Sequence, residues 1–329
     1  MDEQHGLIVM QASGRLPALP LVLMKAGPGA RNHQAIIRAM SVSLRKVLVI
    51  PNAGIAPAGP LAEEFSQALN GLGMESVIEA YDFEHPGKLP QVQGFDLLVA
   101  LGGDGTLLRA GHLAAAAGIP VLGVQAGHLG FLVELSRENW RTMLPRLAQG
   151  DYKVEKRLML SATLVREGSD LQTWDVINEV VISRGRAIRP IEVRVDLSEG
   201  YFTSYIADGL IVATATGSTA YALAVGGPIL PPELRNMLLI PVAPHLALDR
   251  AVVLAEGASV ILRSRAEHEV VLSVDGMQPV SVLPSDRVRV HANPNSLQML
   301  RFGPPNYFYR GLAEMVMRNP ALRMVENDD

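Results

Sequence analysis

Residues 96–106, DLLVALGGDGT, decide the fold that we expect of this chain. The apolar run 96–101 is typical of a strand buried in a sheet, and the Leu- and Ala-rich residues 107–117 predict a helix after the loop. Three glycines in four positions let the loop turn sharply and bring its N–H groups against a ligand, because no Cβ atom stands in the way. Such a loop between a strand and a helix N-terminus stabilises an anion through its amides and the helix dipole. Asp104 would repel a phosphate there, so we expect it to take part in chemistry or to meet a metal ion.

Strands and helices alternate on both sides of this loop. Apolar runs predict strands at 46–51, 76–81, 96–101 and 120–124. Amphipathic or Ala-rich segments predict helices at 61–72, at 107–117, and from Ser136, as the N-cap, to about residue 147. This alternation predicts an α/β domain with an open parallel sheet, whose ligands bind at the carboxyl ends of the strands.

The character of the sequence changes at Tyr152. Short β-rich runs follow at 158–165, 179–183, 191–197, 209–214, 258–263, 270–274 and 287–291, and long helical patterns are scarce. They predict a mainly antiparallel all-β domain after the α/β domain. The expected organisation is a poorly ordered N-terminal extension at 1–43, the α/β domain with the GGDGT loop at 44–150, a β-rich domain at 151–305, and a C-terminal helix at 306–329 that packs back on the first domain.

Composition narrows the classes of protein that fit. The 329 residues are 48% hydrophobic and 19% charged, which suits a soluble globular protein with room for two domains. The net charge of −4 implies no general affinity for nucleic acid or anionic membrane. The chain has no cysteine, so disulfides and thiolate metal sites are excluded. Its acidic start is wrong for a signal peptide, and the apolar stretch 16–24 is too short and too broken by proline to span a membrane. We expect a cytoplasmic protein with no nucleic-acid or membrane partner.

Several familiar catalytic patterns are absent from the sequence. There is no Walker A string, no G-x-G-x-x-G that opens a helix after a strand, and no G-x-S-x-G elbow. The lysines lie at positions 25, 46, 88, 153 and 156, none of them beside a glycine-rich loop. The charge of a bound phosphate would therefore be met by backbone amides, by Mg²⁺ or by arginine.

Two further stretches are informative. In residues 208–221, DGLIVATATGSTAY, a β run gives way to small and hydroxyl residues that offer donors and acceptors with little bulk. The alternative interpretation of this stretch is a tight structural turn. Asn178-Glu179 opens the predicted strand at 179–183, and alone such a pair is common at turns.

Taken together, these stretches resemble a known family. Residues 102–106, 127–132, 178–179, 208–210, 216–221, 226–228 and 244–245 are similar, in this order, to the signature of NAD kinases. The resemblance runs from about Lys46 to the C-terminus, and the string TGSTAY at 216–221 is its most specific part, whereas the glycine loop is shared with diacylglycerol, sphingosine and phosphofructo-kinases. It implies transfer of a phosphoryl group from ATP, or from polyphosphate, to the 2′-hydroxyl of the adenosine ribose of NAD to give NADP. Asp104 would be the proton acceptor, with a divalent ion, Mg²⁺, bridging the donor phosphates.

The resemblance also implies contacts with NAD and ATP. Gly103 and Gly105 would cradle the donor phosphates, Asn178 and Glu179 would bind sugar hydroxyls and base, and Asp208 would read an amide or amino group. The other implied contacts are Gly102, Thr106, Arg109, Phe131, Arg189, Ile206, Thr216, Thr219, Ala220, Tyr221, Ala222, Leu223, Ala224 and His245. Which residues would ligate the metal ion is left open. Homo-oligomers, dimers or tetramers, are expected from the family.

Two other functions compete with a kinase that acts on NAD. One is a lipid or sugar kinase that shares the glycine loop, and the other is a non-catalytic regulator that binds dinucleotides. The sequence departs from the family pattern at Gln125, at Ala215 and in Asp275-Gly276-Met277-Gln278, where Gln278 is displaced by one residue. The sequence leaves open the choice between ATP and polyphosphate, that between NAD and NADH, the oligomer size and any regulation.

Overall fold

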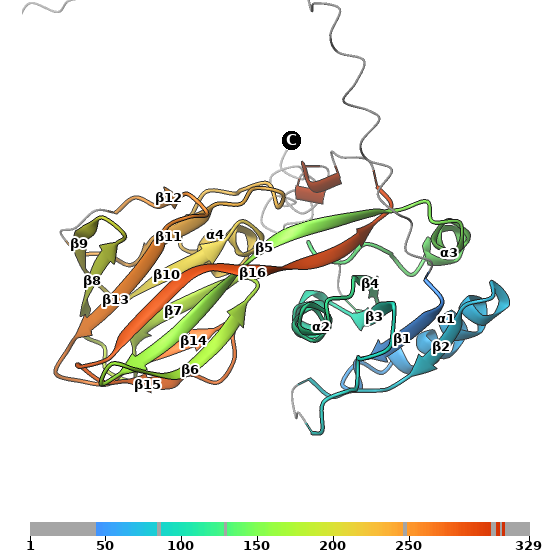
Figure 1. The fold of residues 1–329 in the computed structure, drawn as a ribbon, viewed down its shortest axis with the longest axis horizontal. Helices are drawn as coiled ribbons and strands as arrows, with labels where there is room; N and C mark the ends of the chain where they lie inside the picture. Colours follow the sequence, from blue (N-terminus) through green and yellow to red (C-terminus); the bar gives the residue numbers. More distant parts are fainter. Residues whose placement is uncertain are drawn as a thin grey trace, which may run out of the picture. The chain divides into compact units, whose positions relative to one another are not determined.

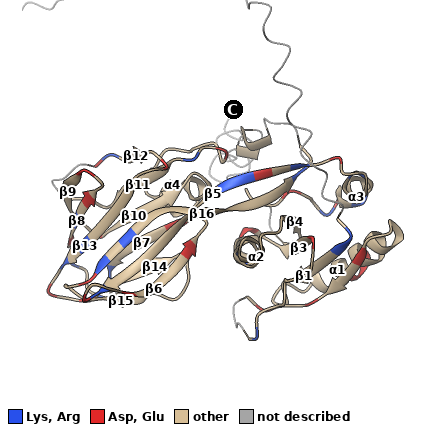
Figure 2. Cartoon of the chain, in the orientation of Figure 1, with Lys and Arg blue, Asp and Glu red and all other residues tan. Residues whose placement is uncertain are grey.

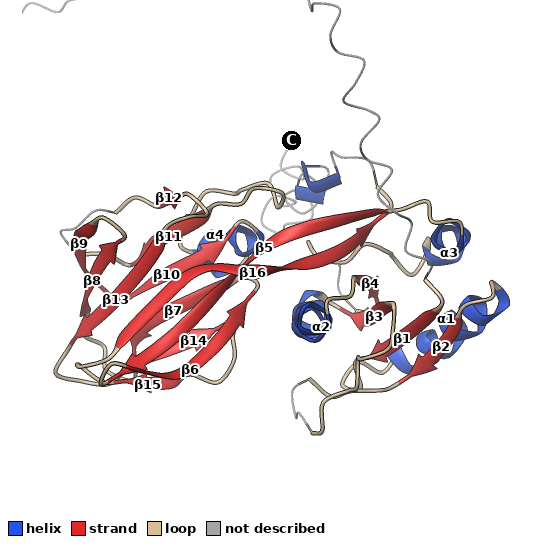
Figure 3. Cartoon of the chain, in the orientation of Figure 1, coloured by secondary structure: helices blue, strands red, loops and turns tan. Residues whose placement is uncertain are grey.

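Two β-sheets organise the part of the chain that the computed structural model describes, namely residues 44–83, 87–127, 130–245, 249–303, 307–309 and 311–312. Figure 3 shows that the long helices accompany the early strands and that later residues are mostly strand. The predicted extension at 1–43 and most of the predicted helix at 306–329 lie outside the described residues. No helix among the described residues is long and apolar enough to cross a membrane.

The first part of the chain is an α/β layer structure, as predicted (Figure 1). Four parallel strands lie in the order β2-β1-β3-β4. Alternate residues of these strands pack on opposite faces, so α1 and α3 cover one face and α2 covers the other. The elements are β1 (Lys46–Pro51), α1 (Ala58–Gly71), β2 (Glu75–Ile78), β3 (Leu97–Gly102), α2 (Asp104–Ala117), β4 (Val121–Gln125) and α3 (Trp140–Ala148).

Several predicted element ends were wrong. Helix α2 begins at Asp104, three residues before the expected start, because the amide of Leu107 already donates to the carbonyl of Gly103. The Ser136 hydroxyl accepts the amides of Glu138 and Asn139, and thus caps a turn ahead of α3, which starts only at Trp140. Helix α1 starts at residue 58 rather than 61, and β2 ends at residue 78 rather than 81.

The later part is antiparallel, again as predicted. A second, six-stranded sheet has the order β12-β11-β10-β7-β14-β15. It packs against strands of the first sheet through one apolar cluster, to which β8 contributes every second residue, Ile191, Val193 and Val195. The strands are β5 (Lys153–Arg166), β6 (Ser169–Val176), β7 (Glu179–Arg184), β8 (Ile191–Leu197), β9 (Gly200–Ala207), β10 (Gly209–Thr214), β11 (Met237–Val242), β12 (Val252–Leu254), β13 (Ser259–Arg265), β14 (Val270–Val274), β15 (Val280–Val282) and β16 (Arg287–Arg301).

Strand β16 joins the two kinds of structure into one sheet. It pairs antiparallel with β5 along most of its length and parallel with β4 at Met299 and Val121. A register shift between Ala292 and Ser296 bends the strand on its way. The first sheet therefore continues without a break as β4-β16-β13-β8-β9, with β5 and β6 attached to β16. The division into domains at 150/151 stays a prediction.

Candidate active site

Asp104 lies where β3 meets α2. Gly103 has extended backbone dihedrals, φ −113° and ψ −166°, and Asp104 is the first residue of the helix. Each carboxylate oxygen of the half-buried Asp104 accepts one backbone N–H: Oδ2 from Phe131 at 2.7 Å and Oδ1 from Leu132 at 2.9 Å. The carboxylate is thus held in one orientation at a helix N-terminus, where negative charge is favoured.

Two glycines make this arrangement possible by their lack of a side chain. A Cβ atom at Gly130 would overlap the carboxylate of Asp104, and one at Gly102 would overlap the side chain of Thr106. Gly105, in contrast, has no atom near the place where a Cβ would stand, and it is exposed. Gly105 is therefore the exposed glycine of the loop, whereas the positions of Gly102 in the loop and of Gly130 outside it have no room for a side chain.

The Thr106 hydroxyl has a partner that the sequence interpretation missed. Its Oγ1 accepts a hydrogen bond of 2.8 Å from Nδ2 of Asn52, which follows β1. The amide of Gly54 donates to Oδ1 of the same Asn52 at 3.0 Å. Asn52 thus connects the carboxyl ends of β1 and β3. The string Asn52-Ala53-Gly54, directly after the predicted strand at 46–51, was the sequence feature that could have indicated this contact.

The Asn178-Glu179 turn is built around Asp275, which the sequence interpretation named only as a departure from the family pattern. Oδ1 of Asp275 accepts the amides of Asn178 and Glu179 at 2.8 and 2.9 Å, and Oδ2 accepts the amide of Ile177 at 2.7 Å. Oδ2 also lies 2.8 Å from Nε2 of His112 in α2. Successive amides that converge on one carboxylate form an anion-binding nest, so Asp275 fixes the backbone of the turn.

Glu179 is a buried acid of unusual proton affinity. Only 8% of the residue is exposed, and Oε2 has no hydrogen-bond partner among the described residues. Burial first, and then the negative charge of Asp275, raises the pKa of Glu179 to about 7, although the amide of Tyr221 acts in the opposite direction. Near neutral pH this carboxyl can both donate and accept a hydrogen bond.

The TGSTAY string packs directly on the Asn178 turn. It forms a short 3₁₀ helix, η1 (Thr216–Thr219), followed by the single helical turn α4 (Tyr221–Ala224). The Oγ1 atom of Thr214 donates to the carbonyl of Ile177 at 2.6 Å and accepts the amide of Gly217 at 3.0 Å. A Cβ atom at Gly217 would overlap the carbonyl of Asn178. The string is thus a tight turn as well as a candidate binding segment.

The predicted contacts within this segment differ in accessibility. Tyr221 is 43% exposed, which suits a ring that stacks on a ligand. Ala222 is fully buried in an apolar cluster with Ile211 and Leu238, so its side chain faces the core. Thr216 is buried, whereas Thr219, Ala220, Leu223 and Ala224 are half-buried or exposed.

A third group of predicted residues surrounds Asp208. Its carboxylate lies 3.0 Å from Nε of Arg184, and its amide donates to the carbonyl of Val242. The amide of His245 donates to the carbonyl of Ile206 at 2.7 Å. Asp208, Ile206 and His245 are therefore neighbours, although 37 residues separate 208 from 245. Arg189 lies exposed in the segment between β7 and β8, and among the described residues its side chain forms no hydrogen bond or ion pair with this group.

Arg109 lines a cavity of about 530 Å³ beside α2. Its Nη1 donates to the carbonyl of Phe83 at 2.6 Å. His112 and Asp275 also line this cavity, and so does Gln278, the residue displaced from the family pattern. The cavity thus adjoins the contact between α2 and the Asn178-Glu179 turn.

A buried arginine supports residues 131–134, the segment whose amides bind Asp104. Nη1 of Arg301 donates to the carbonyl of Leu132 at 3.0 Å and to Glu134 at 2.9 Å, and only 3% of the Arg301 side chain is exposed. The amide of Leu132 is one of the two that orient Asp104. The segment is thus tied to the end of β16.

A second buried arginine, Arg157 in β5, continues this charge cluster toward the TGSTAY string. It donates to Glu155 at 2.7 Å and reaches Oγ1 of Thr216 at 3.5 Å. Burial alone would raise the pKa of Glu155, but the charges of Arg157 and Arg301, with hydrogen bonds from Tyr307 and Arg157, outweigh burial and lower it. Figure 2 shows basic and acidic residues next to each other in this part of β5.

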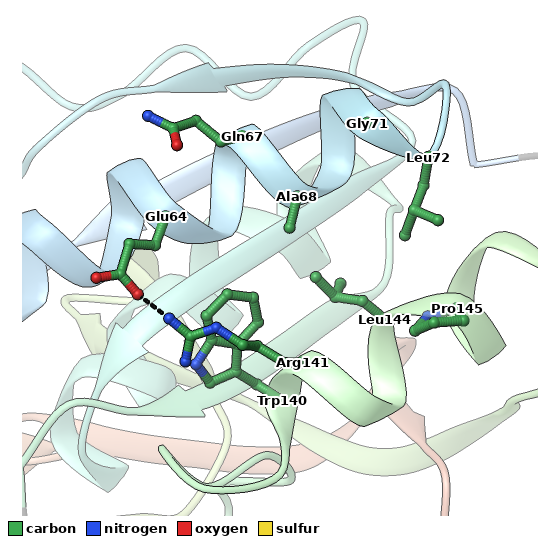
Figure 4. A pocket seen from close by; sticks show the side chains of 9 residues that line it. All are labelled: Glu64, Gln67, Ala68, Gly71, Leu72, Trp140, Arg141, Leu144 and Pro145. Carbon is green, nitrogen blue, oxygen red and sulfur yellow. Dashed lines mark hydrogen bonds and ion pairs between the residues drawn. The ribbon is translucent and has the colours of Figure 1, made fainter.

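A second cavity, of about 600 Å³, lies between α1 and α3 (Figure 4). Glu64 forms an ion pair with Arg141, and the guanidinium of Arg141 lies 4.3 Å above the ring of Trp140. None of the residues predicted to bind NAD or ATP lines it. Within the described ranges, no group of three or more His, Asp or Glu residues could hold a metal ion.

Comparison with known proteins identifies the family. The ATP-NAD kinase N-terminal domain matches residues 54–152, and the ATP-NAD kinase C-terminal domain matches residues 177–302. An NAD kinase of Dehalococcoides mccartyi is 36% identical over 269 residues, which are 82% of this chain and 94% of that protein. An NAD kinase of Symbiobacterium thermophilum is 43% identical over 216 residues, 65% of this chain and 76% of that protein.

Solved structures show the same fold. Yeast NADH kinase in complex with NADH superposes with a TM-score of 0.75 at 23% identity, over 84% of this chain and 89% of that one. An NAD kinase from Archaeoglobus fulgidus in complex with ATP gives a TM-score of 0.63, also at 23% identity, over 81% of this chain and 96% of that one. The two family matches and the NAD kinase relatives show that the chain belongs to the NAD kinase family and is an enzyme that transfers phosphoryl groups.

Proposed function

We propose that the enzyme transfers the γ-phosphoryl group of ATP to the 2′-hydroxyl of the adenosine ribose of NAD, giving NADP and ADP. The ribose oxygen forms a bond to the γ-phosphorus while the bond from that phosphorus to the bridging oxygen of ADP breaks. Asp104 accepts the proton that the hydroxyl loses. The NAD kinases to which the chain is 36% identical over 269 residues and 43% identical over 216 residues support this reaction.

The orientation of Asp104 is the observation that carries its proposed role. Two backbone amides occupy one acceptor position on each oxygen, at 2.7 and 2.9 Å, and a carboxylate offers about four such positions. A further position on an oxygen thus stays available for a hydroxyl proton. A general base in a fixed position contributes roughly 10²–10⁴-fold to a rate.

The acceptor substrate is assigned to the Asn178-Glu179 turn and the residues packed on it. Asp275 binds the backbone amides of the turn, so the side chains of Asn178 and Glu179 remain to contact the ligand. A carboxyl whose pKa is about 7 suits a sugar hydroxyl or a base nitrogen, because it can donate to one and accept from the other. Tyr221, exposed and adjacent, is placed to stack on a ring of the dinucleotide.

Magnesium enters this proposal as part of the donor. Asp104 is the one carboxylate in the glycine loop. Mg²⁺ would enter the site with the phosphates of ATP and neutralise part of their charge. The exposed Gly105 and the amides of the first turn of α2 would meet those phosphates.

The test is a direct assay of the product. The purified enzyme, NAD and Mg·ATP should form NADP, and phosphorus NMR of the product should place the new phosphate on the 2′-oxygen of the adenosine ribose. Parallel reactions with polyphosphate as donor and with NADH as acceptor decide the substrates. The proposal fails if no combination of donor and acceptor yields a 2′-phosphorylated dinucleotide.

The enzyme's assembly is proposed from the family, and its cytoplasmic location is proposed from the sequence. A homo-oligomer, dimer or tetramer, is checked by analytical ultracentrifugation of the full chain. A cytoplasmic location is checked by fractionation of cells that express it.

A further inference from the structure

Asp275 binds two parts of the molecule at once. Three of its hydrogen-bond donors are the successive amides of Ile177, Asn178 and Glu179, and the fourth group is Nε2 of His112. Its side chain is 1% exposed, and its backbone φ of +47° is unusual for a residue other than glycine. A buried carboxylate in a strained position is kept there by its donors, so the loss of one donor should loosen the others.

His112 stands two helical turns after Asp104 in α2. The residue before it, Gly111, lets the helix approach closely, since a Cβ there would lie 3.1 Å from Cδ1 of Ile177 and 3.2 Å from Leu297. The His112 side chain is 16% exposed, and its ring nitrogen is 2.8 Å from the carboxylate. The helix that begins with Asp104 is thus pressed against the strand end that precedes Asn178.

We propose that His112 is a positioning residue, which acts through Asp275 to set the backbone of the Asn178-Glu179 turn and to hold it in register with the helix that carries Asp104. This inference rests on the proposed function of that turn in binding NAD. His112 itself touches neither substrate in this account. Its effect should therefore fall on NAD more than on ATP.

Three variants separate the hydrogen bond from the volume of the ring. His112→Phe keeps a ring but loses the donor, His112→Gln keeps an N–H at a similar distance from the backbone, and His112→Ala loses both. Because one lost hydrogen bond to a charged group corresponds to roughly tenfold in an equilibrium, we expect His112→Phe and His112→Ala to raise KM for NAD about tenfold. The KM for ATP should change less than about threefold, and His112→Gln should restore most of the affinity for NAD.

A second readout does not depend on activity. Amide hydrogen exchange at Ile177, Asn178 and Glu179 should be about tenfold faster in His112→Phe than in the wild type, and close to wild type in His112→Gln. His291→Phe is the matched control, because the hydrogen bond of that ring among the described residues is to the neighbouring backbone carbonyl of Ala292 in β16. It should change neither the exchange at the turn nor the KM for NAD.

The outcomes distinguish this inference from the proposed function. If the wild type forms no NADP, the proposed function fails, and the exchange measurement still tests the contact. If the wild type is active and His112→Phe leaves both the KM for NAD and the exchange at 177–179 unchanged, the inference is overturned. Equal increases in KM for NAD and ATP, with faster exchange throughout the protein, would also overturn it, because they indicate a general loss of stability.

Discussion

Asp104 and Glu179 are two acids of one candidate site, and their surroundings are opposite. Each oxygen of Asp104 accepts a backbone amide, and the residue is half-buried at the start of a helix. Glu179 is 8% exposed, with one oxygen lacking a partner among the described residues and a pKa raised to about 7 by burial and by Asp275. The comparison teaches that the surroundings differ in kind: backbone donors hold the carboxylate of Asp104 in one orientation, whereas burial and a neighbouring charge raise the pKa of Glu179.

Removing the buried support behind Asp104 should have the largest effect on stability. Arg301→Met deletes the donor to the carbonyl of Leu132 and leaves Glu134 buried without its partner, so we expect a loss of about 3–5 kcal/mol in the free energy of unfolding. Arg289→Met, which removes an exposed pair with Asp170, should cost no more than about 1 kcal/mol. Urea denaturation of both variants checks the difference, and equal losses would contradict the supporting role of Arg301.

The raised pKa of Glu179 predicts a stability that depends on pH. From pH 4.5 to about 7 the folded protein binds more protons at Glu179 than the unfolded chain does, so stability falls as pH rises, by about 3 kcal/mol in total. Glu179→Gln cannot ionise. The variant should therefore gain stability relative to wild type between pH 5 and pH 8, as measured by urea denaturation.

The exposed Glu63→Gln in α1 provides the baseline for that measurement. A difference between Glu179→Gln and wild type that stays constant with pH would show that Glu179 titrates alike in the folded and unfolded states.

The smallest changes in stability are expected for substitutions at two glycines near Asp104, and they should have opposite signs. Gly130→Ala forces a Cβ atom onto the Asp104 carboxylate and should destabilise the protein by about 1–3 kcal/mol. Gly105→Ala has open space in the helix and should stabilise it by about 0.5–1 kcal/mol. Thermal unfolding of the two variants gives the signs. A Gly130→Ala variant as stable as Gly105→Ala would show that the carboxylate does not need the space above Gly130.

Local patterns predicted much of this fold. The continuous apolar runs at β1, β3 and β4 are those of a parallel sheet buried on both faces, and helices do cover both. The glycine loop was placed correctly between β3 and α2, but glycines have low helix propensity, so the start of α2 at Asp104 was missed. Strand β16 was expected to end at His291, but it continues to Arg301. Pro294 and its polar neighbours interrupt the β pattern of the sequence, and in the structure they lie at a register shift between Ala292 and Ser296.

The candidate site was harder to predict, because its supports come from distant parts of the chain. Asp275 is 96 residues from Glu179 and 163 residues from His112, and no local spacing connects them. The raised pKa of Glu179 likewise depends on burial between elements. The resemblance to the family pointed to Asn178 and Glu179, and only the structure shows that Asp275 binds their backbone amides.

The central claim is that Asp104 accepts the proton of the ribose hydroxyl, and the rate and substrate affinities of Asp104→Asn test it most directly. The asparagine side chain keeps the shape of the aspartate but loses its basicity. Its NH₂ group would face one of the two backbone amides of residues 131 and 132, which needs an acceptor. If Asp104 had only a structural role, the variant would therefore lose substrate affinity and melting temperature and not kcat. We predict a fall in kcat of roughly 10²–10³-fold, with dissociation constants for NAD and ATP within about threefold of wild type. Unchanged kcat, or a loss that lies entirely in binding and stability, would contradict it.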